Sequence, residues 1–263
     1  MRLYLETMRV SFRRYRAYRA ANIAGLITNG FFGVVRSYVF LALYRERKVA
    51  AGYDLLDALT YVWVTQSLIM PVLMWGWLEI ANTIRTGDIA SDLSKPFSYF
   101  GYWLSRDLGR TVYHVLYRTV PTVFLGWVLF RIQIPERAST WLLFALSLLL
   151  AVVLGFCIRF LINLCGFWTT EVRGINGLAL VALNFLTGFI VPLAFFPPSV
   201  REAVELLPFA GMISIPLNIW LERATGLEAF GLLLQQALWV AVFVLLCQVV
   251  LGAATKKLVV QGG

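Results

Sequence analysis

Six apolar blocks, each about twenty residues long, constrain this chain more than any other feature of its sequence. A helix of that length crosses the ~30 Å hydrocarbon layer of a bilayer. The 263 residues are 60% hydrophobic and 14% charged, whereas soluble domains are roughly 45–50% apolar and about 25% charged. A soluble core could not bury so many apolar side chains in long runs. We predict an all-α membrane protein, with one transmembrane domain over residues 1–263 and six spans at 22–43, 59–80, 111–130, 141–163, 175–195 and 230–251.

The distribution of basic residues predicts the orientation of the chain. The net charge is +9, and basic residues gather at the two ends and between the second and third blocks: Arg2, Arg9, Arg13, Arg14, Arg16, Arg19, Lys256, Lys257, Arg85, Lys95, Arg106 and Arg110. The positive-inside rule places these regions in the cytoplasm. We therefore predict a multi-pass plasma membrane protein with both termini in the cytoplasm. Three basic residues in a predicted outer loop are a mild exception to the rule: Arg45, Arg47 and Lys48. We assign the surplus charge to orientation against anionic lipid and expect no nucleic-acid partner.

Residues 1–20 precede the first span and have an amphipathic helical pattern. Leu5, Met8, Phe12 and Tyr15 recur at spacings of three and four, with arginine residues on the neighbouring face. This pattern is typical of a helix lying in the cytoplasmic interface, and a disordered basic tail is the alternative. The arginine-rich start and the long first block do not fit a cleavable signal peptide, so we expect the first span to be retained.

The stretch 196–229, between the fifth and sixth spans, is apolar but repeatedly interrupted by proline. A continuous helix cannot run through these prolines, and each piece is too short to span. We predict short outer helices that dip into the bilayer and return, which requires their free backbone groups to be buried in protein or to face water. An apolar loop lying on the bilayer surface is the alternative.

Three arginine residues fall within predicted spans, where charge is costly and often functional. Arg118 and Arg159 lie near the cytoplasmic ends of their spans, so we expect their side chains to snorkel to the interface. Arg36 lies past the middle of the first span and is predicted to face protein or a wet cavity. It is a candidate contact for substrate or for gating.

Packing signals are present in three spans. Ser147, Ala151 and Gly155 form a small-residue ridge on the fourth span, while Pro71 and Pro121 predict kinks in the second and third. These features indicate a packed helical bundle and no particular function.

The sequence carries no recognisable set of catalytic, metal-binding or cofactor-binding residues. The only histidine, His114, is expected to be an ordinary packed imidazole, and the acidic residues are not paired closely enough to hold a metal. Cys157, Cys165 and Cys247 lack the spacing of a metal or disulfide framework. No G-x-x-x-x-G-K-[ST] motif is present, so the chain cannot bind ATP through a P-loop of its own. We predict no enzyme activity and no cofactor in this chain.

The inner segment 84–97 has the pattern of a short, exposed helix. Gly87 can end the helix that leaves the membrane, Asp88 can cap a new one and Pro96 can end it, with Ile89 and Leu93 on one face. Such a helix could dock a soluble partner, and a simple connector is the alternative.

Residues 84–110 and the outer proline series resemble a known family. Ile84-Arg-Thr-Gly-Asp-Ile, Leu93-Ser-Lys-Pro96 and Tyr102 to Arg110 are similar to the segment after the second span in ABC-2 type ABC-transporter permeases, particularly a small viologen-exporter-like group that is also described as a domain of unknown function. The outer series resembles that family's outer loop: Gly188, Pro192, Phe196, Pro197, Leu207-Pro208-Phe209 and Pro216. The resemblance covers nearly the whole chain, although its individual motifs are loose.

The resemblance implies a half-transporter in the bacterial inner membrane. Two permeases, often different homologous chains, would surround a pathway, and two ABC ATPase subunits carrying ATP and Mg²⁺ would dock beneath them. The helix in 84–97 would be the coupling helix, with residues 3–18 also touching the ATPase. The coupling residues would be Arg85, Gly87, Asp88, Ile89, Asp92, Leu93, Lys95 and Pro96. The outer gate would comprise Gly188, Pro192, Phe196, Pro197, Pro208 and Pro216.

The expected function is therefore ATP-driven export of a hydrophobic or amphipathic compound, either drug-like or lipid-linked. A membrane enzyme acting on lipid intermediates is one alternative, which predicts a cluster of essential polar residues and activity without an ATPase. A secondary transporter or channel is another, which predicts function in the purified chain alone.

Overall fold

The computed structural model describes residues 1–46, 48–74, 76–169 and 171–257. Within these ranges β-structure is limited to an isolated bridge between Ala50 and Tyr53, so the all-α prediction is confirmed. The main helices are α1 (Arg2–Ala17), α2 (Arg19–Leu43), α3 (Leu55–Leu68), α4 (Glu79–Thr86), α5 (Ile89–Leu93), α6 (Tyr99–His114), α7 (Val120–Phe130), α8 (Ala138–Leu164), α9 (Arg173–Leu186), α10 (Pro198–Leu206), α11 (Ser214–Trp220) and α12 (Gly226–Thr255). Short π and 3-10 turns join several of them: η1 (Ile69–Leu73), η2 (Val115–Thr119), η3 (Cys165–Phe167), η4 (Leu193–Phe195) and η5 (Pro208–Gly211).

Four helices of the described chain are long and apolar enough to cross a membrane: Ala20–Leu43, Leu55–Leu73, Ala138–Phe167 and Gly226–Thr255. They correspond to the first, second, fourth and sixth predicted spans. The third predicted span lies within the unbroken helical run of α6, η2 and α7. The fifth corresponds to α9, which is apolar but only 14 residues long.

Two predicted span boundaries are wrong. The second span ends at Leu73 instead of residue 80, because Pro71 lies in the π-helical turn η1 and Met74 then adopts a φ of 39°. Proline supplies no backbone N–H and its ring crowds the preceding turn. The fifth helix ends at Leu186 instead of residue 195, because Gly188 turns the chain with a φ of 80°. Pro121 is the second residue of α7, which begins directly after the π-helical turn η2, so a π-helical turn contains or closely precedes each of the two prolines at which a kink is predicted.

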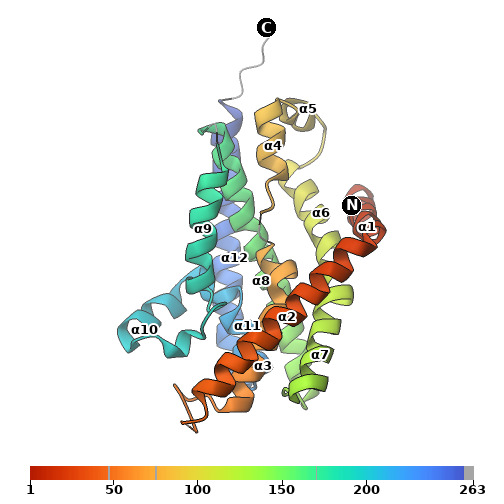
Figure 1. Ribbon diagram of the computed structural model, residues 1–263. Helices are drawn as coiled ribbons and strands as arrows, with labels where there is room; N and C mark the ends of the chain where they lie inside the picture. Colours follow the sequence, from red (N-terminus) through yellow and green to blue (C-terminus); the bar gives the residue numbers. More distant parts are fainter. Residues whose placement is uncertain (47, 75, 170, 258–263) are drawn as a thin grey trace.

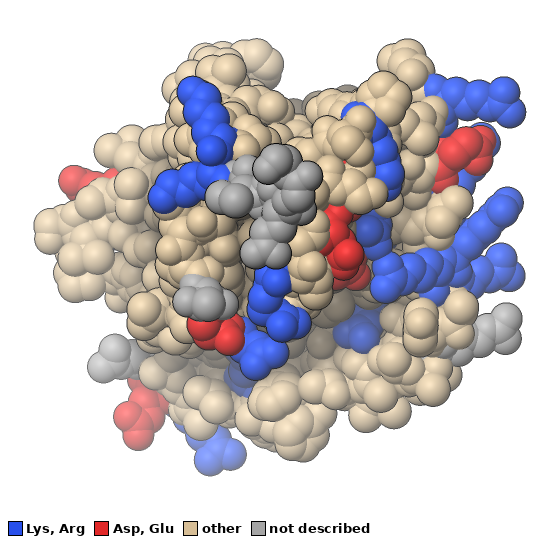
Figure 2. Space-filling view, turned by 90° about the horizontal axis from the view of Figure 1, so that it is seen from above, with Lys and Arg blue, Asp and Glu red and all other residues tan. Residues whose placement is uncertain are grey.

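The long helices form a bundle, and α1 and the last turn of α12 both lie in its upper half (Figure 1). α8 and α12 run side by side along the bundle, and α2 crosses it obliquely. α4 and α5 lie at the end that carries α1 and the last turn of α12. Figure 2 views this end directly and shows Lys and Arg side chains spread over it with fewer Asp and Glu side chains among them.

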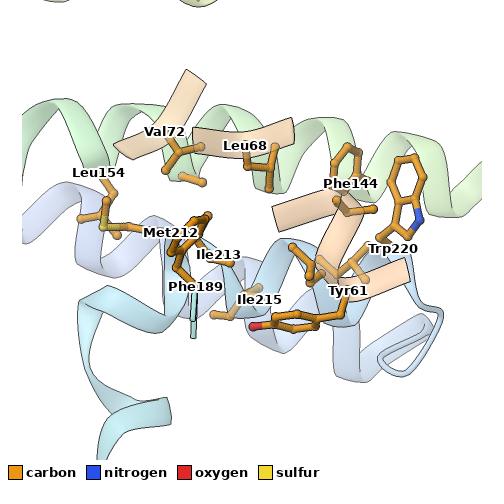
Figure 3. Packing of buried hydrophobic residues seen from close by; sticks show 14 of the residues in the cluster. Tyr61, Leu68, Val72, Phe144, Leu154, Phe189, Met212, Ile213, Ile215 and Trp220 are labelled. Atoms are coloured by element: carbon orange, nitrogen blue, oxygen red, sulfur yellow. The ribbon is translucent and has the colours of Figure 1, made fainter. Parts of the chain in front are cut away.

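The centre of the bundle is α3, the most deeply buried of the four long apolar helices. Its side chains Tyr61 and Leu68 pack with Phe144 of α8 and with Ile213 and Trp220 from the outer segment (Figure 3). The predicted small-residue ridge on α8 is confirmed as a packing surface, because Ser147, Ala151 and Gly155 are all buried. A Cβ on Gly155 would lie 2.5 Å from the Val72 carbonyl oxygen, so the ridge lets η1 approach α8 closely.

α1 confirms the predicted N-terminal helix and excludes the disordered tail. The helix packs along α6, where Ser11 Oγ donates to the Arg106 carbonyl at 2.6 Å and Phe12 meets the edge of Tyr113. Gly109 of α6 leaves room for the backbone of Met8. Part of the amphipathic face is therefore covered by protein, while Leu5 remains exposed.

Candidate functional site

The chain between α3 and α6 forms a small helical projection at the end that carries α1 (Figure 1). Gly87 ends α4 with a φ of 82°, as predicted, and α5 follows as a helix of five residues. The predicted capping bond of Asp88 is wrong. Its backbone is already helical (φ −59°, ψ −24°) and its side chain makes no capping bond, whereas a capping residue normally has extended backbone. The Asp88 carboxylate instead accepts from Thr86 Oγ1 at 2.7 Å.

α5 has an apolar side held by the bundle and a polar side left exposed. Ile89 is buried, and Leu93 packs against the same apolar cluster, which includes Trp77 and Trp103. On the polar side, Lys95 Nζ lies 2.6 Å from Asp92 Oδ1. The hydrogen bond to Asp92 and the attraction of its charge raise the pKa of Lys95. The helix is thus fixed to the body by one side and presents the other to solvent.

An ion-pair group connects this projection to α1 and α6. Glu79 begins α4, and its carboxylate lies 2.9 Å from Arg106 of α6 and 3.6 Å from Arg14 of α1. The Arg106 guanidinium also lies over the ring of Trp103, 4.5 Å from its centroid. The base of α4 is therefore held by charge to two helices that are distant in sequence.

A second, fully buried charge network lies one residue further along α6. Asp107, Arg110 and Arg159 are 3%, 2% and 5% exposed. Asp107 Oδ1 accepts from Arg110 Nη2 at 2.8 Å, and Oδ2 accepts from Arg159 Nη2 at 2.9 Å. The network joins α6 to α8 through one shared carboxylate.

The two guanidinium groups of this network also bind the backbone where α3 ends. Arg110 donates to the carbonyl oxygens of Met70 and Pro71, and Arg159 donates to that of Val72. These carbonyls lie in or beside the π-helical turn around Pro71, where regular helix bonding is disturbed. The predicted snorkelling of Arg159 is wrong, because a carboxylate on another helix holds its side chain inside the bundle.

Arg36 and Arg118 line a cavity of about 470 Å³ between α2, the end of α3 and the chain after α9. Arg36 Nη2 donates to the carbonyl oxygens of Phe189 and Ile190 at 2.7 and 2.8 Å, so its predicted position against protein and a cavity is confirmed. Arg118 is 8% exposed and donates only weakly, at 3.4 Å, to the Ala21 carbonyl. Its predicted snorkelling is also wrong, because the side chain is buried against α2.

The outer segment consists of short helices that fold back into the protein. Gly188, Pro192 and Pro197 precede α10, Pro208 begins η5, and Pro216 lies in α11. Tyr61 donates to the Gly188 carbonyl at 2.6 Å, and Gln236 of α12 donates to that of Gly211 at 2.7 Å. α11 is buried in the central core, which excludes a loop lying wholly on the bilayer surface.

His114 and the cysteine residues occupy packing positions. His114 is buried between the rings of Tyr15 and Tyr113. Cys247 Sγ lies 3.5 Å from the Cys157 carbonyl, and the three cysteines are free. In the described part of the chain, no group of three or more His, Cys, Asp or Glu side chains could hold a metal ion.

The structure brings together residues that sequence reasoning placed in separate groups. Arg106 and Arg110 are assigned from the sequence to orientation and to the segment that carries the family resemblance, and in the structure each pairs with a carboxylate from the bundle. Asp107 is the buried carboxylate at the centre of the second network, and no role of its own is predicted for it from the sequence. An acidic residue within a run of basic ones, close to the start of an apolar block, is the signal that could have identified it. The predicted coupling residues and outer-gate residues lie at opposite ends of the bundle (Figure 1).

Comparison with protein families gives a match over most of the chain. A family model described as ABC-2 family transporter protein matches residues 33–262. A search of curated proteins found no match.

Proposed function

The chain belongs to the ABC-2 family of transporter proteins and is a transmembrane component of an ABC transporter, and on that premise we propose that it works as an exporter subunit. It moves a hydrophobic or amphipathic compound, drug-like or lipid-linked, out across the bacterial inner membrane. A separate ATPase subunit binds ATP and Mg²⁺ and hydrolyses the ATP. The observation that carries this proposal is the helical projection, which has an anchored apolar side and an exposed polar side.

The projection is the proposed contact with the ATPase, and residues 84–97 form its coupling segment. Arg85, Asp88 and Lys95 are exposed there, while Ile89 and Leu93 fix α5 to the bundle. A partner that binds the polar side and moves would therefore move α5 together with the part of the bundle to which it is packed. The helix α1, in residues 1–20, lies at the same end (Figure 1) and offers a second contact.

The two charge groups provide a route from the projection into the membrane domain. Movement of α4 is carried by Glu79 to Arg106, and the neighbouring Asp107 is bonded to both guanidinium groups that hold the end of α3. Packed elements with two arrangements can convert a small displacement into a larger one. The irregular turn at Pro71 is the proposed point of flexure.

The outer segment 196–229, together with the turn before it, is the proposed outer gate. Its residues are Gly188, Pro192, Phe196, Pro197, Pro208 and Pro216. Tyr61 of α3 contacts Gly188, so displacement of α3 reaches the gate directly. Arg36 bonds the same turn at Phe189 and Ile190, which supports its proposed place at the pathway.

The exposed apolar faces support membrane lipid and a second permease as neighbours. α2 and α12 expose long rows of apolar side chains, including Phe31 and Leu238. The second permease is proposed to be a different homologous chain that completes the pathway opposite α2. The basic end in Figure 2 supports cytoplasmic termini by the positive-inside rule.

Co-purification with a matched pair of charge swaps tests the proposal. The tagged chain, expressed in its native host, is expected to retain a P-loop ATPase. Exchanging the ion pair of the projection (D92K with K95D) should reduce that retention. Exchanging the equally exposed pair of α10 (R201E with E205R), which lies at the other end, should not.

Each outcome separates the candidate functions. Absence of any P-loop ATPase, or equal behaviour of the two swaps, overturns the proposal. Transport by the purified chain alone would favour a secondary transporter or channel, and turnover of a lipid intermediate without ATPase would favour a membrane enzyme.

A further inference from the structure

The cavity beside α2 has the size and wall of a ligand site. Its volume of about 470 Å³ falls within the ~300–1,000 Å³ typical of small-molecule pockets. The wall is mostly apolar and includes Phe32, Ile69 and Met70. Phe32 is half exposed, so the cavity opens on the side of the bundle.

The guanidinium of Arg118 is buried at this cavity, and no carboxylate of the described residues pairs with it. Its Nε has no hydrogen-bond partner among the described residues, and its Nη2 makes only the weak donation to the Ala21 carbonyl. A Cβ on Gly25 would overlap the guanidinium, so the absence of a side chain at this position creates the space for it. Burying a charge without a partner of opposite charge is costly, so an anion that enters the cavity would gain a strong contact with Arg118.

Arg36 adds a second positive charge to the same wall. Its bonds go to two backbone carbonyls and, at 3.5 Å, to Thr65 Oγ1, which satisfy its donors without neutralising it. Among the residues that the structure describes, neither Arg36 nor Arg118 forms an ion pair within 4.0 Å. The cavity is therefore apolar in its wall and positive in its charge.

We propose that this cavity binds an amphipathic anion. The anionic group contacts Arg118, and the apolar body extends along α2 past Phe32 toward Phe189. Positions 25 and 36 of α2 are roughly 16 Å apart at 1.5 Å per residue, so Arg36 attracts the ligand by its field and does not share the same anionic group. The proposal deepens the export function proposed above by naming the chemical class of its substrate, and it rests on that function only for the direction of movement.

The direct test measures binding to the full chain in phosphatidylcholine nanodiscs by native mass spectrometry. Dodecyl phosphate, dodecyltrimethylammonium and dodecyl maltoside are matched in chain length and differ in head charge. We expect dodecyl phosphate to bind at least about tenfold more tightly than the other two, because hydrogen bonds to charged groups are the stronger ones. Equal binding of the three probes overturns the proposal without reference to any variant.

Variants then locate the site. Arg118→Gln should weaken dodecyl phosphate binding by about tenfold or more, and Arg36→Gln should weaken it less. Arg45→Gln, at an exposed arginine outside the cavity, is the matched control and should leave it unchanged. Thermal unfolding of each variant shows whether it remains folded. Unchanged binding by a folded R36Q/R118Q chain overturns the proposal.

Competitors identify the source of the anion. If phosphatidylglycerol added to the nanodisc displaces dodecyl phosphate, the ligand is a membrane lipid. If it does not, the ligand is a single-chain amphiphile, and both results support an amphipathic anion. Displacement by inorganic phosphate at the same concentration shows a plain anion site and overturns the proposal. Because no ATPase is present in these experiments, their failure is distinguishable from failure of the coupling proposal.

Discussion

Two pairs of arginine residues in this bundle have the same chemistry but different surroundings. Arg110 and Arg159 share the carboxylate of Asp107, and the pocket that Asp107 and Arg110 line has a volume of only about 10 Å³. Arg36 and Arg118 have only neutral partners and line an apolar cavity of about 470 Å³. In both pairs backbone carbonyls accept hydrogen bonds, so hydrogen bonding alone does not separate them.

The difference between the pairs is the presence of a counter-charge. In the first pair the shared carboxylate lowers the cost of burial, and the guanidinium groups are free to hold the disturbed end of α3. In the second pair no carboxylate of the described residues offsets the positive charge. An anion that enters the cavity would therefore be bound favourably. Replacing a charged side chain should therefore lower the stability of the protein in the first region, and should leave it unchanged or raise it in the second.

The largest effect is expected from Asp107→Asn. The change is nearly isosteric but leaves the guanidinium groups of Arg110 and Arg159 buried without an anion. We expect a loss of about 3–5 kcal/mol in the free energy of unfolding, the range measured when a buried pair is broken. Thermal or denaturant unfolding in one detergent measures it, with Asp92→Asn at the exposed pair as control. A loss no larger than that of the control would show that the shared carboxylate does not stabilise the two guanidinium groups.

Arg159→Met and Arg118→Met compare the two regions directly. The first removes bonds to Asp107 and to the Val72 carbonyl, so we expect a loss of about 1–3 kcal/mol. The second removes a buried charge without a carboxylate partner, so we expect a change within about 1 kcal/mol or a gain in stability. Unfolding midpoints of the two variants, measured side by side, test this prediction. Equal losses of stability would show that the counter-charge does not distinguish the two regions.

Asn29→Asp tests whether an added carboxylate gives the cavity the counter-charge that the first pair of arginine residues already has. Asn29 lines the cavity and donates to the Gln66 carbonyl at 3.3 Å. The added negative charge should weaken binding of dodecyl phosphate by about tenfold, since like charges inside a poorly solvated cavity repel. Thr28→Ser, also at the cavity wall, keeps the charge unchanged and is the control. Native mass spectrometry measures both, and undiminished binding by the aspartate variant would contradict the prediction.

The smallest effect is expected at the exposed pair of Asp92 and Lys95. Because the hydrogen bond to Asp92 raises the pKa of Lys95 above its ordinary 10.5, the folded state holds this proton more tightly than the unfolded state. The stabilisation is therefore fully present below pH 10.5 and is lost as pH rises through the higher folded value. Unfolding midpoints of the protein and of Lys95→Gln, compared between pH 8 and pH 11, should converge only at the alkaline end. A difference that is constant with pH would show that the pair contributes nothing through ionisation.

The fold was largely predictable because its helices follow from local composition. Each of the six apolar blocks contains a helix in the part of the chain that the structure describes, and α1 has the amphipathic face that Phe12 and Tyr15 predict. Two helix ends were misplaced, at Leu73 and Leu186, because apolar residues continue beyond the points where Pro71 and Gly188 disturb the backbone. Hydropathy predicts which residues lie in an apolar environment, but it does not predict where the helical backbone is interrupted.

The candidate site was predictable only in part. The projection around α5 could be located from Gly87, Ile89 and Leu93, since a turn and one apolar face are local patterns. The misassigned cap of Asp88 depended on backbone angles that residue type does not determine. The place of Asp107 within a run of basic residues is a local signal, but its partner Arg159 and the α2 contact of Arg118 are distant in sequence, and no local pattern identifies them.

The sequence by itself determined that this chain is a helical membrane protein with basic ends, since solvation by lipid and by anionic surfaces acts on each segment separately. It also placed the exposed projection and the proline-broken outer segment. Only the tertiary structure decided which buried arginine residues are neutralised. Arg159 meets a carboxylate 52 residues away, whereas Arg118 rests against α2 where Gly25 leaves room, and it forms no ion pair with any described residue. Charge compensation inside a bundle is a property of which helices come together, and that is settled only when they pack.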